Sequence, residues 1–585
     1  MTEFKVTPVS ESPSQNTNQT NVNHNEPSAN NSFSNHQNQT VNNSDNKKIT
    51  VLDNIFKYLE NNFNCKAMEF SKIILIGVLV LIFFASIMGF FIMWFTDAYN
   101  NSLLEKLILA NDTNAKSWWI KPPIQPLLKV HIFNYTNADR FLKGLDTKLR
   151  VEDLGPYVYK ETPEKINLKY HNDSTITYQD NKIYDFDPEL SNGKQYDKVV
   201  VPNVPMISAI AMFQYSGFVK QFALKAALSA TSSTPFKTLA AHSFLWGYED
   251  KLIELSGGTG YAGSNSGKFG ILMNKNGTSR DIYTIHSGEN GLNKLSTIKD
   301  FNGVTKLDFW GTDECNKVEG TVGAQFPPHL MDKKQPLNLY ITDLCRKFPL
   351  AYNKEVTVFE GIPAWRYKPE KNVFAHPNIH ADNQCYCHLE SGVCPPSGLF
   401  NASLCSHNAP VLISFPHFYE GDESLQDTID GLSPNQQLHE TYADIHPRLA
   451  FAMNGASRFQ INIQVKKNDF AIDGFEKFKD DQILPVLWME VTTGEIPVEL
   501  KAMVYHSTFT ANAIQMSLRY GSLCFFLLTL ALLIGTCYCK RKINRKDNEA
   551  AVVNDNYGAS GTDNHASEIS VKLNVDSETI QTNGV

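Results

Sequence analysis

The stretch IILIGVLVLIFFASIMGFFIMWF, at residues 73–95, decides the architecture of this 585-residue chain. It contains no charged residue, and a helix of this length, at about 1.5 Å rise per residue, crosses a hydrocarbon core of about 30 Å. A second uncharged stretch, YGSLCFFLLTLALLIGTCYC at residues 520–539, is just long enough to do the same. Residues 1–72 precede the first stretch, which disfavours a cleaved signal peptide. The sequence therefore predicts two transmembrane helices.

The basic residues beside the two spans predict their orientation. Lys and Arg collect on the cytosolic side of transmembrane helices. Here they stand before the first span and after the second, at Lys47, Lys48, Lys66, Lys72, Lys540, Arg541, Lys542, Arg545 and Lys546. Arg519 opposes this pattern weakly. We therefore expect both termini in the cytosol and one luminal or extracellular domain over residues 96–519.

Cysteines and glycosylation motifs agree with this topology. Disulfides form outside the cytosol, and six of the ten cysteines lie between the spans, at Cys315, Cys345, Cys385, Cys387, Cys394 and Cys405. Their spacing alone leaves the pairing open. Asn-X-Ser/Thr motifs in the same region predict N-glycans on Asn111, Asn134, Asn172, Asn276 and Asn401.

The segments at the two ends of the chain are polar. Residues 1–48 are rich in Asn, Ser, Thr and Gln, a composition that predicts disorder. Residues 49–72 are a juxtamembrane segment that forms either a short amphipathic helix or an unstructured linker. Residues 540–585 are a cytosolic tail in which we expect disorder after Arg545. Cys537 and Cys539 lie where S-acylation is common, and the alternative is a pair of ordinary thiols.

Charge and motifs disfavour several classes of function. The net charge of −8 comes without a basic stripe, so we expect no nucleic-acid partner. The Gly-rich run at residues 256–270 lacks the residues of a phosphate-binding loop, and no Gly-X-Ser-X-Gly elbow or HExxH helix occurs. We therefore predict no enzyme and no cofactor. We also expect no metal, because oxidised cysteines cannot bind zinc and this removes most of one candidate site, at His376, His380, Cys385, Cys387 and His388.

Between the spans, many short runs alternate apolar and polar residues and end at Gly, Pro or Asn. Helical spacing is clearest at residues 206–231 and 244–255. The alternating pattern is typical of antiparallel strands. It occurs in LLKVHIFNYT (127–136), GPYVYKE (155–161), SRDIYTIHSG (279–288), EVTVFEG (355–361) and RFQINIQVKK (458–467). The domain is therefore predicted to be mainly β with a helical insertion.

A longer stretch, SWWIKPPIQPLLKVHIFNYTNADRFLKGLDTKLRVEDLGPYVYKE at residues 117–161, closely resembles the start of the ectodomain in class B scavenger receptors. The ordered set of similar motifs covers nearly the whole chain except its tails, and it is highly specific although each motif alone is weak. The similarity continues through VPNVP (201–205), FLWGYED (244–250), GVTKLDFWGTDECNKVEGTVGAQFPP (303–328), ITDLCRKF (341–348), CYCHLESGVC (385–394), ISFPHFYEGD (413–422), RFQINIQV (458–465) and ILPVLWMEV (483–491).

The resemblance implies a fold. The ectodomain would be a large, irregular antiparallel β-barrel with a helical bundle at its membrane-distal apex and an apolar tunnel from the apex toward the bilayer. The apex helices would cover residues 206–231 and 241–255. The family pattern also implies three disulfides, Cys315 with Cys385, Cys345 with Cys405, and Cys387 with Cys394.

The resemblance further implies a receptor that binds lipids or lipoprotein-like particles and transfers lipid through the tunnel. A tunnel that ends at the membrane lets an apolar ligand reach the bilayer without crossing water. The implied partners are membrane lipids, fatty acids or sterols, and also lipoprotein particles or a lysosomal enzyme cargo. Oligomers would form through the apex or the transmembrane helices. Plasma membrane and endosomal or lysosomal membrane both stay open.

The apex would present a docking patch made of Phe218, Val219 and Phe222. The alternative is that these three side chains pack against the other helices. Lys220 and Lys225 lie on the same stretch, and they are either ligand-binding residues or ordinary surface lysines.

The chain departs from the family pattern at two places in the apex. The positions that hold ligand-binding lysines in fatty acid translocase are Ser229 and Thr231 here, which weakens the case for anion capture by that route. The apical histidine that acts as a pH switch in the lysosomal member has no counterpart at residues 206–231. His242 is the nearest histidine, and we expect it to be an ordinary surface residue.

Two other classes share the predicted topology. A two-span ligand-gated channel needs a polar pore lining, whereas the second span offers only Ser522, Thr529, Thr536 and cysteines. An adhesion glycoprotein differs from the receptor only in lacking a lipid tunnel, so lipid binding distinguishes the two.

Overall fold

The computed structural model describes residues 71–557 except residues 111–112, 256–266, 360, 388–392 and 468–473. The predictions for the N-terminal tail, the juxtamembrane segment, Asn111, most of the Gly-rich run and the end of the C-terminal tail lie outside these residues. The chain divides into two compact units. One is made of residues 83–527, and the other of residues 1–82 with residues 528–585.

Both predicted spans are helical. α2 (Ser71–Phe95) contains the first span and α14 (Ala511–Tyr557) contains the second. Each lies in a helix that is long and apolar enough to cross a membrane. The prediction of disorder directly after Arg545 is wrong, because α14 extends to Tyr557. A nucleated helix propagates easily, and the Lys, Glu and Ala residues beyond Arg545 favour this conformation.

Within residues 83–527, α2 and α14 meet beside the ectodomain. The Trp94 indole N–H donates a hydrogen bond to the carbonyl of Arg519 at 3.1 Å, and the Arg519 guanidinium lies 4.4 Å from the centre of the Trp94 ring. The Tyr99 hydroxyl donates to the carbonyl of Ala511 at 2.9 Å. Trp and Arg are favoured where a helix leaves the hydrocarbon region. These contacts therefore suit the membrane surface on the ectodomain side.

The ectodomain is built on one 15-stranded sheet. Each strand named next is hydrogen-bonded to its neighbours in the order β10 (Ile298–Phe301), β9 (Tyr283–His286), β3 (Thr175–Phe186), β2 (Leu149–His171), β1 (Leu127–Tyr135), β19 (Ile483–Thr492), β18 (Ala452–Gln464), β17 (Tyr442–Ile445), β13 (Ile362–Pro369), β12 (Arg346–Val358) and β11 (Leu337–Ile341). All ten pairs along this path are antiparallel. The mainly antiparallel class is therefore confirmed, and among the described strands the path is open, ending at β10 and β11.

Shorter strands join this path or form small pairs beside it. Four short strands complete the large sheet: β8 (Gly277–Thr278), β14 (Phe400–Asn401), β15 (Val411–Ser414) and β16 (Ile429–Asp430). The separate pairs are β4 (Lys198–Pro202) with β5 (Phe236–Ala240) and β6 (Tyr248–Glu249) with β7 (Lys268–Phe269). Among the described residues, the remaining α-helices outside the apex and the spans are α3 (Ala98–Leu104), α4 (Asn114–Ile120), α5 (Ala138–Leu142), α10 (Asp313–Asn316), α11 (Glu423–Gln426), α12 (Gln436–His439) and α13 (Val498–Tyr505).

The centre of the sheet is buried on both faces. In β1, Val130 and Ile132 are fully buried and pair with residues of β19. β19 is buried over residues 483–488 without alternation, which is typical of a strand covered on both sides. An apolar core lies against one face, and the segment between β15 and β17 covers part of the other through buried polar side chains.

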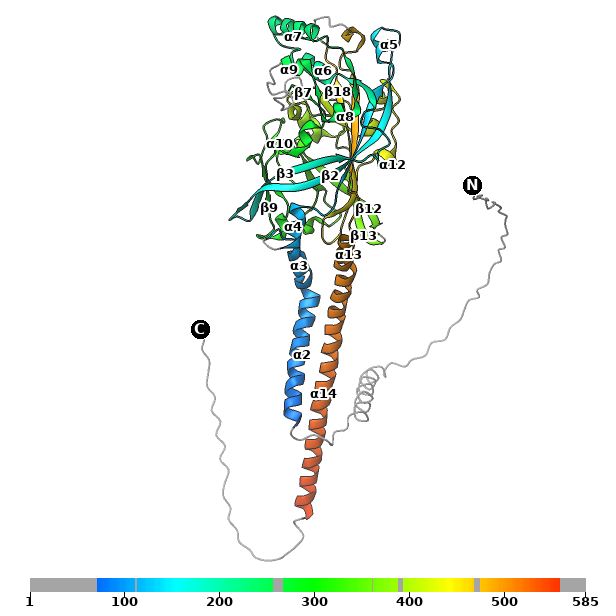
Figure 1. The fold of residues 1–585 in the computed structure, drawn as a ribbon. Coiled ribbons are helices and arrows are strands. Elements are labelled where there is room, and N and C mark those ends of the chain that lie inside the picture. Colours follow the sequence, from blue (N-terminus) through cyan, green and yellow to red (C-terminus); the bar gives the residue numbers. More distant parts are fainter. Residues whose placement is uncertain are drawn as a thin grey trace, which may run out of the picture. The chain divides into compact units, whose positions relative to one another are not determined.

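Four short helices form the apical group. They are α6 (Val204–Met212), α7 (Phe218–Ala230), α8 (Ala241–Trp246) and α9 (Lys251–Leu255). Continuous helices are expected over residues 206–231 and 241–255, and each of them is interrupted once. Gly217 caps α7 in an extended conformation, and Gly247 ends α8 at φ 136°, a value that L side chains rarely adopt. Figure 1 places α7 at the end of the ectodomain furthest from α3 and α13.

Candidate functional site

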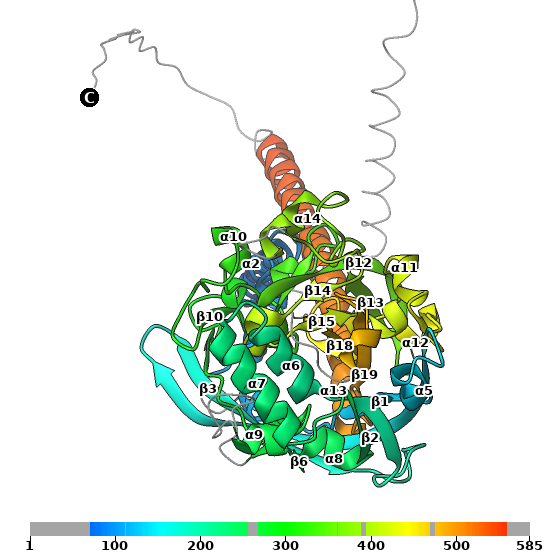
Figure 2. The same cartoon turned by 90° about the horizontal axis from the view of Figure 1, so that it is seen from above.

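The candidate site is the group formed by α6, α7 and α9, which contact one another. Seen from above, they lie together over one end of the ectodomain (Figure 2). α7 is attached through Leu224 and Leu228, which are buried in the apolar core. Because these two side chains point inward, the opposite face of the helix points to solvent.

That outer face is apolar. Phe218 is 71% exposed, Val219 79% and Phe222 59%. The alternative that these side chains are packed away against the other helices is therefore wrong. The rings of Phe218 and Phe222 lie 6.3 Å apart in a stacked arrangement, and the nearby Tyr215 is 92% exposed. We call Tyr215, Phe218, Val219 and Phe222 the apical patch.

An apolar pocket of about 400 Å³ lies beside the apical patch, between α6, α7 and α9. Among the described residues of its lining, Lys220 supplies the one charged side chain. These residues are Pro205, Ala209, Met212, Phe213, Lys220, Ala223, Leu224, Ala227, Leu252, Ile253 and Leu255. The site therefore combines an exposed apolar surface with an adjacent pocket whose rim carries a single positive charge.

The other predicted apical residues lie outside this pocket. Lys225 is exposed on α7. Thr231 is the C-terminal cap of α7, and its hydroxyl donates to the carbonyl of Ala227 at 2.9 Å. His242 is partly buried rather than freely exposed, and its Nδ1 has no hydrogen-bond partner in the part of the chain that the structure describes.

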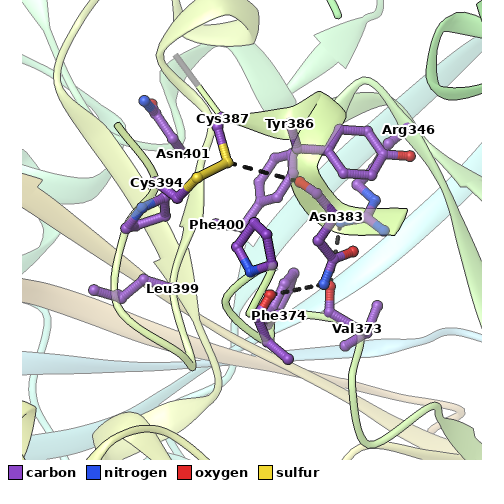
Figure 3. A pocket seen from close by; sticks show the side chains of 13 residues that line it. Arg346, Val373, Phe374, Asn383, Tyr386, Cys387, Cys394, Leu399, Phe400 and Asn401 are labelled. Atoms are coloured by element: carbon purple, nitrogen blue, oxygen red, sulfur yellow. Dashed lines mark hydrogen bonds between the residues drawn. A yellow bond between two sulfur atoms is a disulfide. The ribbon is translucent and has the colours of Figure 1, made fainter. Parts of the chain in front are cut away.

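Three disulfides lie in the ectodomain, and they join the pairs that the family pattern implies: Cys315–Cys385, Cys345–Cys405 and Cys387–Cys394. With the sulfurs of Cys385 and Cys387 bonded in this way, neither is available as a thiolate ligand. Cys387–Cys394 borders a small cavity of about 20 Å³ (Figure 3). This volume holds about one water molecule, so the cavity is too small for a lipid.

Arg346 lies beside this cavity and is buried, with only 5% of its surface exposed. Its guanidinium stacks 3.9 Å from the centre of the Tyr386 ring and donates to the carbonyls of Lys347 and Val373. Burial lowers the pKa of Arg346. Asn383 fixes the adjacent loop by donating to the carbonyl of Ala375 at 2.8 Å (Figure 3). It also donates to the carbonyl of Asn372 at 2.9 Å. These contacts hold the disulfide region together.

The predicted glycosylation sites differ in exposure. Asn172, in the turn between β2 and β3, and Asn276 are exposed. Asn134 and Asn401 are partly buried, and their side-chain oxygens accept hydrogen bonds from the backbone N–H of Val200 and of Ser403.

The two cysteines at the end of the second span also differ. Cys537 is a free, exposed thiol. Cys539 is disulfide-bonded, and a bonded sulfur cannot carry an acyl chain. S-acylation of Cys537 and Cys539 stays a prediction, and for Cys539 it requires the reduced thiol that the cytosol maintains.

Sequence reasoning missed one group of polar residues. Asp153, His417 and His439 lie together on one face of the sheet. His417 contacts Asp153, which is 264 positions away in the sequence, and stacks on His439. The alternation of Lys129 and His131 with apolar neighbours in β1 was the available signal that this face of the strand is polar.

Comparison with known proteins adds independent evidence. A sequence model of the CD36 family matches residues 75–537. Lysosome membrane protein 2 from Homo sapiens is 34% identical over 425 residues, which make up 72% of this chain and 86% of that protein. Scavenger receptor class B member 1 from Bos taurus is 31% identical over 399 residues, 66% of this chain and 75% of that protein.

Proposed function

The chain belongs to the CD36 family, that of the class B scavenger receptors, and on this premise we propose that it binds lipid or lipid-bearing particles at its apical helices and passes lipid through the ectodomain to the bilayer. It is an integral membrane protein with two helices that can span a membrane. Neither relative is named as an enzyme, and we propose that this chain is not one. The apical patch beside the apolar pocket is the observation that carries the proposal.

Exposed apolar area at the apex supports a lipid ligand. Leaving a large apolar side chain in water instead of burying it costs about 1.5–3 kcal/mol. Phe218, Val219 and Phe222 stand together in one helical turn and are all mostly exposed. A lipid surface or a particle that covers them recovers this free energy on binding.

The pocket supports a single lipid as a second kind of ligand. Its volume of about 400 Å³ falls within the range of about 300–1,000 Å³ that is usual for small-molecule sites. Its apolar lining suits an acyl chain or a sterol. Lys220 at the rim suits a carboxylate or phosphate head group, because an ammonium group attracts an anion most strongly beside a low-dielectric surface.

A protein cargo is the alternative to a lipid ligand. The apical patch projects outward from α7, so a partner protein with an apolar surface could cover it without entering the pocket. Lysosome membrane protein 2, one of the relatives, is named for the lysosome, and a lysosomal enzyme is the protein cargo that we propose. The two ligands differ in which residues they need: a protein needs the patch, and a single lipid needs the pocket.

The topology completes the proposal. Both termini would be cytosolic and residues 96–519 would be luminal or extracellular, with N-glycans at the sites predicted above. The location would be the plasma membrane or the endosomal and lysosomal membrane. Protein partners and lipoprotein-like particles would meet the protein at its apex. Oligomers would form through the apex or the transmembrane helices.

Native mass spectrometry with lipid extraction tests lipid binding. The full-length protein is purified into a lipid nanodisc of defined synthetic phospholipid and analysed for additional bound lipids. We expect co-purified fatty acids, sterols or phospholipids that a competitor displaces stoichiometrically. A protein that carries no additional lipid and takes none up would contradict lipid binding and would favour the adhesion or cargo alternatives.

A further inference from the structure

A partly buried carboxylate on one face of the sheet is surrounded by imidazole and indole groups. Asp153, on β2, accepts a hydrogen bond from the Trp488 indole at 3.0 Å. Its two oxygens also lie 3.1 Å from His131 Nδ1 and 3.0 Å from His417 Nε2. The four residues come from β2, β19, β1 and the short helix η9 (Pro416–Phe418).

A second buried histidine stacks on this group. The rings of His417 and His439 lie 4.5 Å apart and within 10° of parallel. They are 4% and 3% exposed, respectively. His439 is the last residue of α12, so the stack joins α12 to the sheet.

The segment that carries His439 has little else to hold it. We call residues 433–440 the latch. Residues 433–438 are all exposed, Glu440 is partly buried, and His439 is the one buried residue of the latch. Glu440 adds an ion pair with Lys368 at 2.6 Å, and its carbonyl accepts from Arg458. The position of α12 therefore depends on keeping the His439 ring buried.

Hydrogen bonds require both stacked rings to be neutral. Nδ1 of His417 accepts the backbone N–H of Ser433 at 3.1 Å, and Nδ1 of His439 accepts the backbone N–H of Asn435 at 3.0 Å. A protonated imidazole carries hydrogen on both nitrogens and accepts none. Protonating either ring removes a hydrogen bond within or to the latch, and protonating both places like charges face to face.

The surrounding charges do not compensate for this. The groups that face His439 are Asp153 on β2, His131 on β1, His417 on η9 and Arg458 on β18, and Arg458 is itself paired with Glu490 on β19. Burial lowers the pKa of His439 to about 4, and the opposing attraction of Asp153 does not outweigh it. An unburied histidine titrates near pH 6.5. The undocked latch therefore binds more protons, and docking weakens as the pH falls from about 6.5 toward 4.

The backbone beside the stack is strained. His417, Phe418 and Glu420 all have positive φ, at 53°, 57° and 58°. Non-glycine residues rarely adopt this conformation, and such strain persists only where the surrounding contacts hold it. Weakening the stack leaves this strain unopposed, which favours release.

The latch also forms a wall of a polar recess. The recess has a volume of about 680 Å³, and its lining includes Tyr352, Lys368, Tyr419, Gln436 and Glu440. Gln436 and Glu440 belong to the latch. Movement of α12 therefore changes the shape of this recess directly.

We propose that residues 433–440 are an acid-released latch: on acidification, protonation of His439 in its stack against His417 undocks α12 from the sheet and opens the recess beside it. The inference does not rest on lipid binding at the apex, which lies on other elements. It gives the protein a response to acidic compartments that needs no apical histidine.

Hydrogen–deuterium exchange of the full-length protein in nanodiscs tests the latch. Peptides that cover residues 433–440 are compared at pH 7.5 and pH 5.0, with rates corrected for intrinsic exchange. A shift of the histidine pKa from about 6.5 to about 4 predicts that protection of the latch falls about thirtyfold at pH 5.0, while peptides of β19 keep their protection. Equal latch protection at both pH values would overturn the proposal, as would an equal loss throughout the ectodomain.

A variant identifies the titrating group. His439→Gln removes the titration but keeps a side-chain acceptor, so we expect latch protection to become nearly independent of pH. His329→Gln, at an exposed histidine, is the matched control and should keep the thirtyfold change. An undiminished pH response in His439→Gln would assign the response to another group and overturn the proposal. If this variant fails to fold, the wild-type comparison of latch and β19 peptides still decides.

Discussion

The guanidinium of Arg458 on β18 lies 2.5 Å from the carboxylate of Glu490 on β19, directly across the strand pair. Both side chains are nearly buried, at 11% and 10% exposure. Lys129, on the next strand, also reaches Glu490 at 2.7 Å. One carboxylate therefore balances two cations from two neighbouring strands at the centre of the sheet.

Replacing this carboxylate should destabilise the ectodomain strongly. Glu490→Gln leaves two cations without their counter-charge, and removing one partner of a buried pair costs about 3 kcal/mol or more. Urea unfolding of the detergent-solubilised protein, followed by tryptophan fluorescence, measures the loss. Glu355→Gln is the control, because Glu355 pairs with Lys333 at the surface and is 66% exposed, so its loss should stay below about 1 kcal/mol. Equal effects of the two changes would contradict this account of the central pair.

The same pair predicts a pH dependence. Burial opposes ionisation of Glu490, but Lys129 and Arg458 outweigh burial and lower its pKa overall. A glutamate in the unfolded chain titrates near pH 4.3. The stability from this pair is therefore fully present above about pH 4.3 and is lost as the pH falls through the lower folded value. Unfolding free energies of wild type and Glu490→Gln should differ by a constant amount between pH 7.5 and pH 5 and converge below about pH 4.

The apical patch predicts loss of ligand binding without loss of stability. In the double variant Phe218→Asp and Phe222→Asp, two charges enter a surface that binding must desolvate. We expect binding of phospholipid vesicles or lipoprotein-like particles to cells expressing the full-length protein to fall at least about tenfold, which corresponds to about 1.4 kcal/mol. Surface expression and glycan maturation should match wild type. Ile379→Asp, at a 66% exposed apolar residue outside the apical helices, should bind normally, and unchanged binding by the double variant would rule out docking at the patch.

The disulfides should contribute unequally to stability. Cys387 and Cys394 are 7 positions apart, whereas Cys315 and Cys385 are 70 apart. A longer closed loop restricts the unfolded chain more, which predicts losses of about 2.5 and about 4 kcal/mol when each pair is replaced by serine. Urea unfolding of the two double-serine variants measures the order, and a larger loss for the short loop would contradict the entropic explanation.

Local patterns explain most of what the sequence predicted. Period-two alternation located β1 and β18, and uncharged length located both spans, because each signal is complete within about twenty neighbouring residues. The breaks at Gly217 and Gly247 escaped, since the apolar spacing continues across them. The outward direction of Phe218 and Phe222 was one of two open alternatives, because α7 carries apolar residues on both faces and only packing decides which face is buried.

The polar cluster could not be predicted in this way. Asp153 and Trp488 are in contact although they are 335 positions apart in the sequence. Such contacts depend on which strands become neighbours, and single-sequence periodicity does not determine strand order. The pairing of β1 with β19 brings the two ends of the ectodomain sequence together and creates this cluster.

We propose that the pocket between α6, α7 and α9 holds a lipid. The most direct measurement is photo-crosslinking of a photoactivatable fatty acid or sterol to the full-length protein in nanodiscs, with the labelled peptides identified by mass spectrometry. Ala227 lines the pocket, whereas its neighbour Ala226 is exposed and is not part of the lining. We predict that Ala227→Trp, which fills the pocket, lowers labelling of the apical helices at least about tenfold, and that Ala226→Trp does not. Equal labelling of both variants, or labelling confined to other parts of the ectodomain, would contradict the claim.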